Sequence, residues 1–245
     1  MGSEMCIRDS HGLGSLARRE LMHGRNALQD GSKDGWRWAA TLHASRHFPH
    51  SHDLARRTLA GWMTGYPGEG RQHWDISFPR PFAKEVGDWA SRRDLPQAII
   101  YAIMREESGF SPHIESWANA KGLMQLMDKT AARMGKKDGM KTPIGRSIFS
   151  PDTNIRLGSA YLAELAQKSR RSPVLMAAAY NGGWGNVGGW VRAGKDKELD
   201  LWVEDIPFGQ TRKYTKRVMT SFWIYSWLLE EAKIPVVDLK VVSRL

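Results

Sequence analysis

Cysteine is almost absent from this chain of 245 residues. The only one, Cys6, cannot form an intrachain disulfide, and a zinc site built from several cysteines is excluded for the same reason. The redox compartment stays open, because a chain poor in cysteine suits the cytosol and the periplasm equally.

Long apolar runs are also missing. The densest run covers residues 222–229, far short of the roughly 18 apolar residues that a membrane-spanning helix needs. The first ten residues, MGSEMCIRDS, are polar and charged and lack the apolar centre of a secretory signal peptide. We therefore expect no transmembrane segment, and we interpret the opening as a truncated or artificial start.

Alternating strand patterns are nearly absent too, whereas apolar residues recur at helical spacing. Hydrophobic residues make up 41% and charged residues 25% of the chain, which excludes wholesale disorder and favours a globular protein. The predicted fold class is therefore all-α. The expected helices lie around residues 13–21, 36–42, 54–62, 82–89, 96–108, 152–165, 173–180 and 211–232, with Pro96 in a first turn and Asp152 as a cap.

Glycine and proline cluster at residues 66–70 and 78–81, and the helical pattern becomes regular after them. This predicts a helical N-terminal region over residues 1–77, with breaks at 30–32 and 48–50, and a larger domain over residues 78–245. In the first region His43 and His47 are four residues apart, a spacing that suits a metal ion. No carboxylate or cysteine completes a ligand set nearby, so we expect no metal site, and we expect no cofactor.

Positive charge is in excess, with 36 Lys and Arg against 26 Asp and Glu, a formal net charge of +10. Such a chain favours anionic partners: nucleic acid, an anionic membrane surface or an acidic cell-wall polymer. Zinc-finger cysteines and a basic zipper are both missing, so the positive charge is the only feature that favours a nucleic-acid partner. Charge by itself usually reports a solvated surface, and we expect no nucleic-acid partner.

Glu107 carries the strongest chemical signal. It continues the apolar stripe of Ile99 and Ile103 at intervals of four residues, so its carboxyl should be partly buried and its pKa raised. A carboxylic acid with a raised pKa is what protonation of the leaving oxygen of a glycosidic bond requires. Gly109 should end the helix and place Glu107 at the edge of a cleft, with Glu106 as a solvated neighbour.

Four sequence blocks resemble, in the same order, the catalytic domain of the soluble lytic murein transglycosylases, which has a goose-type lysozyme-like fold. The blocks are ESGFSP with GLMQLM downstream (107–127), DTNI (152–155), AAYNGG (178–183) and EDIPF (204–208). The resemblance implies an all-α, lysozyme-like catalytic domain. It also implies that the region before it is the truncated remnant of a longer helical region.

Functional residues follow from the resemblance. Glu107 matches the family's single catalytic acid and base. Of the matches to substrate-binding positions, Met124 is equally consistent with a core residue and Asn181 with a residue that shapes the turn into the glycines. The full set of substrate-binding matches is Ser116, Met124, Gln125, Tyr180, Asn181 and Glu204.

The implied reaction cleaves the β-1,4 bond between N-acetylmuramic acid and N-acetylglucosamine without water and leaves 1,6-anhydromuramic acid ends. Two alternatives stay open: a lysozyme-type hydrolase, and a non-catalytic basic module that binds cell wall or nucleic acid. We expect peptidoglycan glycan strands and other cell-wall enzymes as partners, and a monomer. The resemblance implies a location in the periplasm or cell envelope.

Some positions depart from the family pattern. Asn119 replaces a glycine, and asparagine tolerates left-handed backbone; Asp128 replaces a proline and could cap a helix. Residues 183–188 satisfy G-x-G-x-x-G, but residues 177–180 predict a helix where a dinucleotide site needs a strand. We therefore reject nucleotide binding and expect a glycine loop that approaches saccharide. The tryptophans to test for sugar contact are Trp117, Trp184 and Trp190.

Overall fold

The computed structural model describes residues 33–58, 71–141, 144–194 and 197–229. Regular structure in these residues is helical, and β-pairing is limited to two isolated bridges, Glu115 with Lys121 and Lys121 with Leu126. The predicted all-α class is confirmed. The chain divides into two compact units, Met1–Pro81 and Phe82–Leu245.

The first unit contains three described helices, α3 (Lys33–Ala44), α4 (Phe48–Thr58) and α5 (Arg71–Ser77). Their apolar faces meet in a small core, because residues at helical spacing lie on one side of each helix. The core consists of Ala39, Leu42, Leu54, Ala55 and Ile76, with Trp36 and Trp38 packed against it.

The break expected at residues 48–50 is displaced. Helix α3 ends at Ala44 and α4 begins at Phe48, so Pro49 lies in the first turn of α4, where a proline removes no helical hydrogen bond. The helix expected at 13–21, the break at 30–32 and the end of the helix expected at 54–62 lie outside the described residues. Across the described stretches, no three His, Cys, Asp or Glu side chains gather as a metal site.

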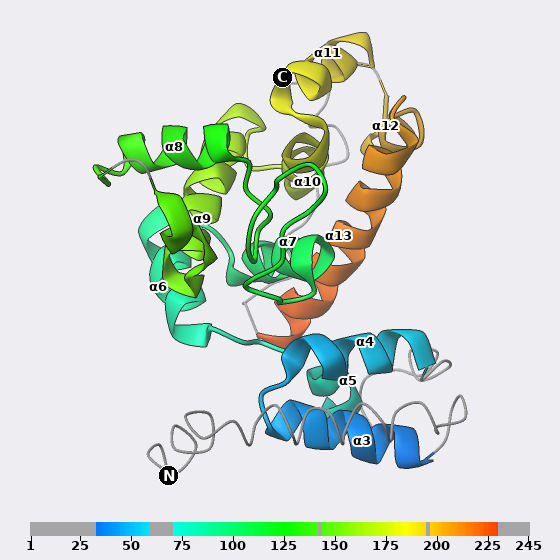
Figure 1. The fold of residues 1–245 in the computed structure, drawn as a ribbon. Coiled ribbons are helices and arrows are strands. Elements are labelled where there is room, and N and C mark those ends of the chain that lie inside the picture. The colour runs from blue at the N-terminus through cyan, green and yellow to red at the C-terminus, as the bar shows by residue number, and fades with distance from the viewer. Residues whose placement is uncertain (1–32, 59–70, 142–143, 195–196, 230–245) are drawn as a thin grey trace. The chain divides into compact units, whose positions relative to one another are not determined.

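The second unit holds longer helices arranged around α7 (Gln97–Ser108). Figure 1 shows α6, α8 and α9 on one side of α7 and α11, α12 and α13 on the other. Their bounds are α6 Ala83–Arg93, α8 Asp128–Lys137, α9 Pro151–Lys168, α10 Pro173–Gly182, α11 Trp184–Ala193, α12 Leu199–Glu204 and α13 Gly209–Leu228, with a short 3-10 helix, η2, at Gly145–Phe149. Helices α6 and α8 pack on α9, and α13 packs on both α7 and α10. In the part of the chain described here, no helix combines the length and apolarity needed to cross a membrane.

Helix α7 forms the centre of this unit because its middle is apolar on every side. All residues from Ala98 to Met104 are buried. The helix begins one residue after Pro96, which precedes the first turn instead of lying in it, and ends at Ser108. Gly109 then adopts a φ of 55°, a left-handed conformation that suits glycine.

The two aspartates expected as helix caps are not caps. Asp152 lies inside the first turn of α9, and its carboxylate accepts a 2.8 Å hydrogen bond from the indole N–H of Trp89. Asp128 begins α8, and both its carboxylate oxygens accept from Lys121 at 2.8 Å. Side chains from outside each helix therefore take the carboxylates that could have bound helix N–H groups.

Candidate active site

Glu107 lies in the last turn of α7, where α13 packs against it. The phenol of Tyr214 on α13 donates a 2.6 Å hydrogen bond to Oε1 of Glu107. Tyr214 is buried and Glu107 is partly buried. Within the described residues, Oε2 of Glu107 accepts no hydrogen bond, so this oxygen is the one left to meet a ligand.

The surroundings of Glu107 raise the pKa of its carboxyl from 4.5 to about 7. Burial is the main cause, since desolvation disfavours the charged form. The hydrogen bond from Tyr214 lowers this pKa, the negative charge of Glu106 raises it, and the positive charge of Arg217 lowers it. The direction is the one expected from the apolar stripe.

Glu106 is not the solvated neighbour that the sequence indicated. Its side chain is only 3% exposed. Arg217 donates from Nε to Oε2 of Glu106 at 2.7 Å, and Arg105 donates from Nη1 to Oε1 at 3.2 Å. The expectation was wrong because Arg217 lies on α13, and only the packing of α13 on α7 brings it to Glu106.

The segment between α7 and α8, residues 109–127, is tied to both sides of the unit. The hydroxyl of Ser108 donates to the carbonyl of Leu123 at 2.7 Å. Gly122 has a φ of 74°, and a Cβ there would lie 2.3 Å from the Asn154 amide, so a side chain would displace the contact. Asn119 adopts a φ of 61°, the left-handed backbone that its place in the motif predicts.

Asn154 on α9 organises this segment, although sequence reasoning did not single it out. Its Oδ1 accepts from the backbone N–H of Met124 at 2.7 Å, and its Nδ2 donates to the carbonyls of Lys121 at 3.0 Å and Ile148 at 2.8 Å. The side chain is fully buried. An asparagine beside Ile155, within an otherwise apolar helical face, was the signal available in the sequence.

Tyr180 reaches the same segment from α10. Its phenol donates to the carbonyl of Met124 at 2.8 Å. Burial and then the charge of Glu107 raise the pKa of Tyr180 well above 10, so Tyr180 stays protonated and lies within electrostatic reach of Glu107. Glu107, Tyr214 and Tyr180 therefore form one cluster where α7, α10 and α13 meet.

Known proteins resemble this region of the chain. The family model of the transglycosylase SLT domain matches residues 85–203. The soluble lytic murein transglycosylase of Escherichia coli strain K12 is 33% identical over 222 residues, which cover 86% of this chain and 33% of that protein. A solved structure of an inactive mutant of lytic transglycosylase Slt from Pseudomonas aeruginosa is 31% identical, with a TM-score of 0.76, over 96% of this chain and 36% of that one. Residues 85–203 belong to the transglycosylase SLT domain family.

The likeness covers only part of the relatives. The chain spans about a third of the length of the curated relatives that it matches. A further solved structure, a complex of the 70-kDa soluble lytic transglycosylase with bulgecin A, is 26% identical with a TM-score of 0.76, over 95% of this chain and 36% of that one.

Two residues that match substrate-binding positions of the lytic transglycosylase family shape the 109–127 segment itself. The hydroxyl of Ser116 accepts from the backbone N–H of Ala120 at 3.0 Å. Gln125 has a φ of 45°, and its Nε2 donates to the carbonyls of Gly122 at 3.0 Å and Ile114 at 3.2 Å. Both side chains are half-buried, and their contact with substrate stays a prediction.

Met124 takes the core position, one of the two that the sequence left open. Its side chain is fully buried and packs against Gly158, where an added Cβ would lie 2.2 Å from the Met124 sulfur. It therefore offers no side-chain surface to a ligand, and the core alternative describes it better. Its backbone matters instead, because its N–H and carbonyl bind Asn154 and Tyr180.

Asn181 and Glu204 lie outside the carboxyl cluster. Asn181 Oδ1 accepts from the hydroxyl of Thr211 at 2.8 Å and so ties α10 to α13. Glu204 ends α12, where its 59% exposed carboxylate pairs with Lys216 at 2.5 Å. The charged side chains that act on the Glu107 pKa are Glu106 and Arg217, not Glu204. The structure thus does not bring Glu204 to the proton of Glu107.

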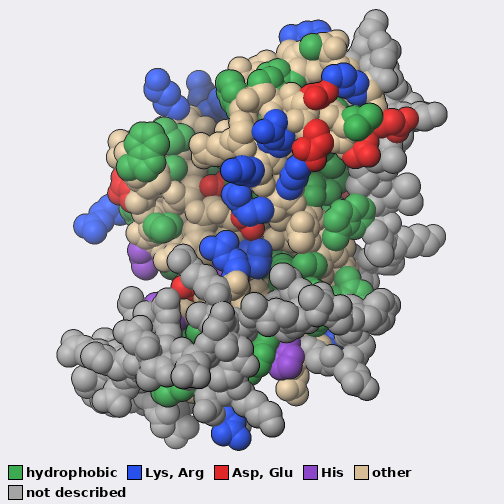
Figure 2. Space-filling view, turned by 90° about the vertical axis from the view of Figure 1, so that its right-hand side faces the viewer, with side chains coloured by type: hydrophobic (Ala, Val, Ile, Leu, Met, Phe, Trp, Pro, Cys, Tyr) green, Lys and Arg blue, Asp and Glu red, His purple; other side chains and the backbone are tan. Residues whose placement is uncertain are grey.

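The exposed side of α13 is basic. Figure 2 faces the side of α12 and α13 and shows Lys and Arg side chains gathered there with carboxylates beside them. Helix α13 exposes Lys213, Lys216 and Arg217. This places part of the positive charge of the chain on the helix that also carries Tyr214.

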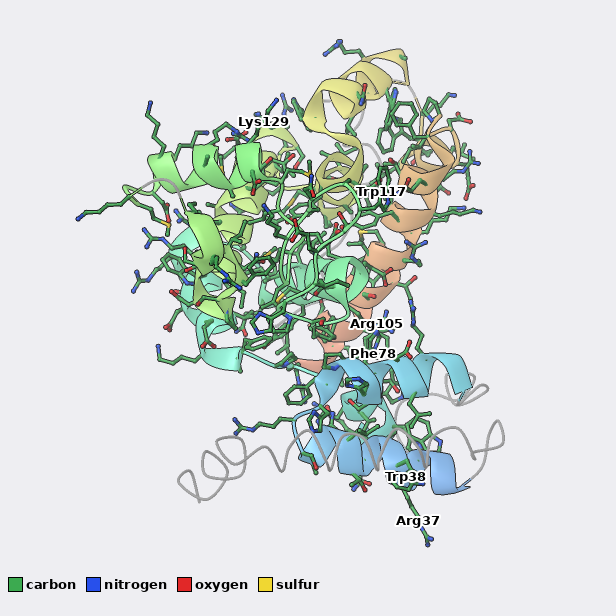
Figure 3. The ribbon with its side chains drawn as sticks, viewed as in Figure 1. Arg37, Trp38, Phe78, Arg105, Trp117 and Lys129 are labelled. Carbon is green, nitrogen blue, oxygen red and sulfur yellow. The ribbon has the colours of Figure 1, made fainter. Side chains whose placement is uncertain are left out.

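The three candidate tryptophans differ in exposure. Trp117, labelled in Figure 3, is 98% exposed on the 109–127 segment. Trp190 packs edge-on against Phe208 with ring centroids 5.0 Å apart, and Trp184 begins α11 and is partly buried. The glycine tract follows α10, so a helix precedes it, as expected when the dinucleotide interpretation was rejected.

Two cavities among the described residues are lined by residues of the second unit. One of about 140 Å³ is lined by Trp190 and Trp202, among others. The other, of about 540 Å³, is lined by Lys121 and Phe149, among others. Glu107 lines neither of them, so the site is defined by its carboxyl cluster and not by these cavities.

Proposed function

We propose that this chain is a lytic transglycosylase that cleaves the β-1,4 bond between N-acetylmuramic acid and N-acetylglucosamine in peptidoglycan. The observation that carries the proposal is the partly buried carboxyl of Glu107, whose pKa is raised to about 7. Such a carboxyl is protonated often enough at neutral pH to act as an acid. It also ionises easily enough to act as a base afterwards.

In the proposed first step Glu107 donates its proton to the glycosidic oxygen, and the bond from that oxygen to the anomeric carbon breaks. Oε1 already accepts from Tyr214, so Oε2 is the oxygen that holds the proton. The substrate's acetamido group stabilises the positive charge that develops on the sugar. The Glu107 carboxylate then removes the proton of the C6 hydroxyl, whose oxygen bonds to the anomeric carbon and closes the 1,6-anhydro ring.

A single working carboxyl supports this route over hydrolysis. Hydrolytic glycosidases normally use two carboxylates, one as acid and one as nucleophile or base. Glu106 is occupied by two arginines, and Glu204 is occupied by Lys216. Tyr214 assists Glu107 in the first step, because its hydrogen bond stabilises the carboxylate that forms when the proton is transferred.

The substrate-binding part of the proposal rests on the matched positions. The proposed contacts with the glycan strand are made by Ser116, Gln125, Tyr180, Asn181 and Glu204, while Met124 acts through its backbone. The net charge of +10 attracts the carboxylates of the peptide portion of peptidoglycan. We also propose that residues 1–77 belong to a helical region preceding the catalytic domain, and that the protein acts as a monomer in the periplasm or cell envelope, beside other cell-wall enzymes.

The product spectrum tests the reaction. Purified sacculi are digested in heavy-oxygen water, and the soluble muropeptides are analysed by mass spectrometry. We expect 1,6-anhydro ends without heavy oxygen. Reducing ends that carry heavy oxygen would identify a lysozyme-type hydrolase instead. Sacculus or DNA binding that salt abolishes, without any released muropeptide, would identify a non-catalytic basic module.

A further inference from the structure

The last turn of α7 contacts α13 through three polar interactions in antiparallel order. The consecutive α7 residues 105, 106 and 107 bind the α13 residues 221, 217 and 214, at 3.0, 2.7 and 2.6 Å respectively. The α13 residues are three and four positions apart, so they lie on one face of that helix. The carboxyl of Glu107 is therefore the end of a continuous polar row and not an isolated group.

Glu106 is the charged centre of this row. Its side chain is 3% exposed, that of Arg105 is 11% exposed, and that of Arg217 is 51% exposed. Burying a carboxylate is costly unless it is paired and hydrogen-bonded, and here two guanidinium groups meet both conditions. The protein thus holds a doubly paired carboxylate at the position that precedes the proposed catalytic acid in the chain.

We propose that Glu106 is a positioning residue: its carboxylate, held by Arg217 and Arg105, keeps the proton on Glu107 at neutral pH. The inference rests on the proposed function, because it is the acid step that needs this proton. Arg217 acts in the opposite sense, since it holds Glu106 in place but also favours the carboxylate form of Glu107.

The charges around Glu107 support this division of roles. Glu106 raises the pKa of Glu107, and Arg217 lowers it. The phenols of Tyr214 on α13 and Tyr180 on α10 also face it, and both stay uncharged because burial and the nearby carboxylate raise their pKa values well above 10. Arg217 is half exposed, so solvent screens its charge more than it screens the buried Glu106.

The test measures the proton on Glu107 directly, so it does not depend on the protein being a transglycosylase. The carboxyl carbon of Glu107 is titrated by NMR in the full chain, in the parent and in Glu106→Gln and Arg217→Gln variants. We expect the midpoint to fall by roughly 0.5–1 pH unit in Glu106→Gln and to rise in Arg217→Gln. The matched control is Asp88→Asn, which also removes one carboxylate from an ion pair. Asp88 pairs with Lys84 on the exposed face of α6.

The activity readout follows the same sign. In Glu106→Gln, muropeptide release should match the parent at pH 5 and fall roughly three- to tenfold below it at pH 8, because the acid form of Glu107 is depleted. Arg217→Gln should keep more activity than the parent at pH 8, relative to its own value at pH 5. A structural role alone would lower the rate at all pH values and leave the profile unmoved.

Three results would overturn the inference. An unchanged Glu107 midpoint in a folded Glu106→Gln variant refutes it, even if the parent releases anhydro ends. A shift of equal size in Asp88→Asn refutes it as well, because net charge would then explain the effect. If Glu106→Gln does not fold, an Arg217→Gln midpoint that fails to rise refutes it. The absence of anhydro products with the midpoints shifted as expected would refute the proposed function alone.

Discussion

Two partly buried carboxylates of the second unit, Glu107 and Glu164, have pKa values that are shifted in opposite directions. Burial raises the pKa of both. For Glu107 it prevails, and the pKa rises to about 7, because the main opposing contact is the single hydrogen bond from Tyr214. For Glu164, hydrogen bonds from three cations more than offset burial, and the pKa falls to about 2.

The surroundings of Glu164 make this contrast concrete. Arg133 and Lys168 donate to its carboxylate at 2.5 and 2.9 Å, and Lys137 also binds it. The contacts of Arg133 and Lys137 join α8 to α9, that of Lys168 lies within α9, and together they occupy both carboxylate oxygens. Burial alone therefore does not make a catalytic acid. A catalytic acid is a buried carboxyl to which the fold supplies few compensating charges.

Replacing Glu107, the proposed proton donor, should have the largest effect on activity. Glu107→Gln should lower the rate of muropeptide release by roughly 10²–10⁴-fold, because no proton donor remains. A raised pKa means that the ionised Glu107 costs stability as the pH rises from 4.5 through 7. Glu107→Gln should therefore be more stable than the parent at pH 8, by roughly 1–3 kcal/mol, and equal to it at pH 4. Urea unfolding at both pH values measures this, and near-normal activity would refute the assignment of Glu107.

Replacing Glu164 should lower the stability of the protein at neutral pH, whereas replacing Glu107 should raise it. Its lowered pKa contributes stability that is present above pH 4.5 and is lost as the pH falls towards 2. Glu164→Gln should destabilise the protein at pH 7 by about 1–3 kcal/mol and by much less near pH 2, with the rate of muropeptide release little changed. Thermal unfolding across pH checks this. A loss of stability that does not depend on pH would contradict the ion-pair explanation.

Removing the Tyr214 hydroxyl removes the main contact that opposes the effect of burial on the Glu107 pKa. Tyr214→Phe should raise the Glu107 pKa further and move the alkaline limb of the activity profile to higher pH. The rate should fall roughly tenfold, since the carboxylate formed by proton transfer loses a charge-assisted hydrogen bond. A pH profile measures both. An alkaline limb that moves to lower pH would be inconsistent with a hydrogen bond to the carboxylate.

The smallest effect on stability is expected from replacing Trp117, whose side chain lies on the surface. Trp117 is 98% exposed, so Trp117→Ala should change stability by less than about 0.5 kcal/mol. If it contacts sugar, KM for glycan strands should rise by roughly two- to tenfold while kcat stays unchanged. Trp202→Ala is the contrasting variant, because Trp202 is 2% exposed and donates to the carbonyl of Trp190 at 3.2 Å, so its loss should mainly lower the melting temperature. An unchanged KM in Trp117→Ala would remove this tryptophan from the proposed binding surface.

Some features of the site could be predicted because they depend on near neighbours in the chain. The apolar stripe that ends in Glu107 predicts the partial burial and the direction of the pKa shift, and Gly109 predicts the end of α7. The left-handed backbone of Asn119 follows from a position that suits glycine. Each of these rests on spacings of four residues or fewer, or on the conformational range of one residue.

Other features could not be predicted, because a distant residue decides them. Glu106 has the composition of a solvated helix end, yet Arg217, 111 positions later, covers and pairs it. Asp152 looks like a cap, but the Trp89 indole binds it from 63 positions away. For Met124 the sequence left a core place and a place at the site equally open, and its packing against Gly158 of α9 decides for the core.

The amino-acid pattern alone was enough for the helical class, the family resemblance and the proposal of Glu107 as the acid, because periodicity and motif order are properties of the linear chain. Packing decided which groups surround that acid. Tyr214 and Arg217 reach α7 only because α13 lies along it, and Asn154 fixes the 109–127 segment only because α9 lies beneath it. The physical reason is range: helix formation is set within one or two turns, whereas a carboxyl's proton affinity is set by whichever charges and dipoles the fold brings within a few ångströms.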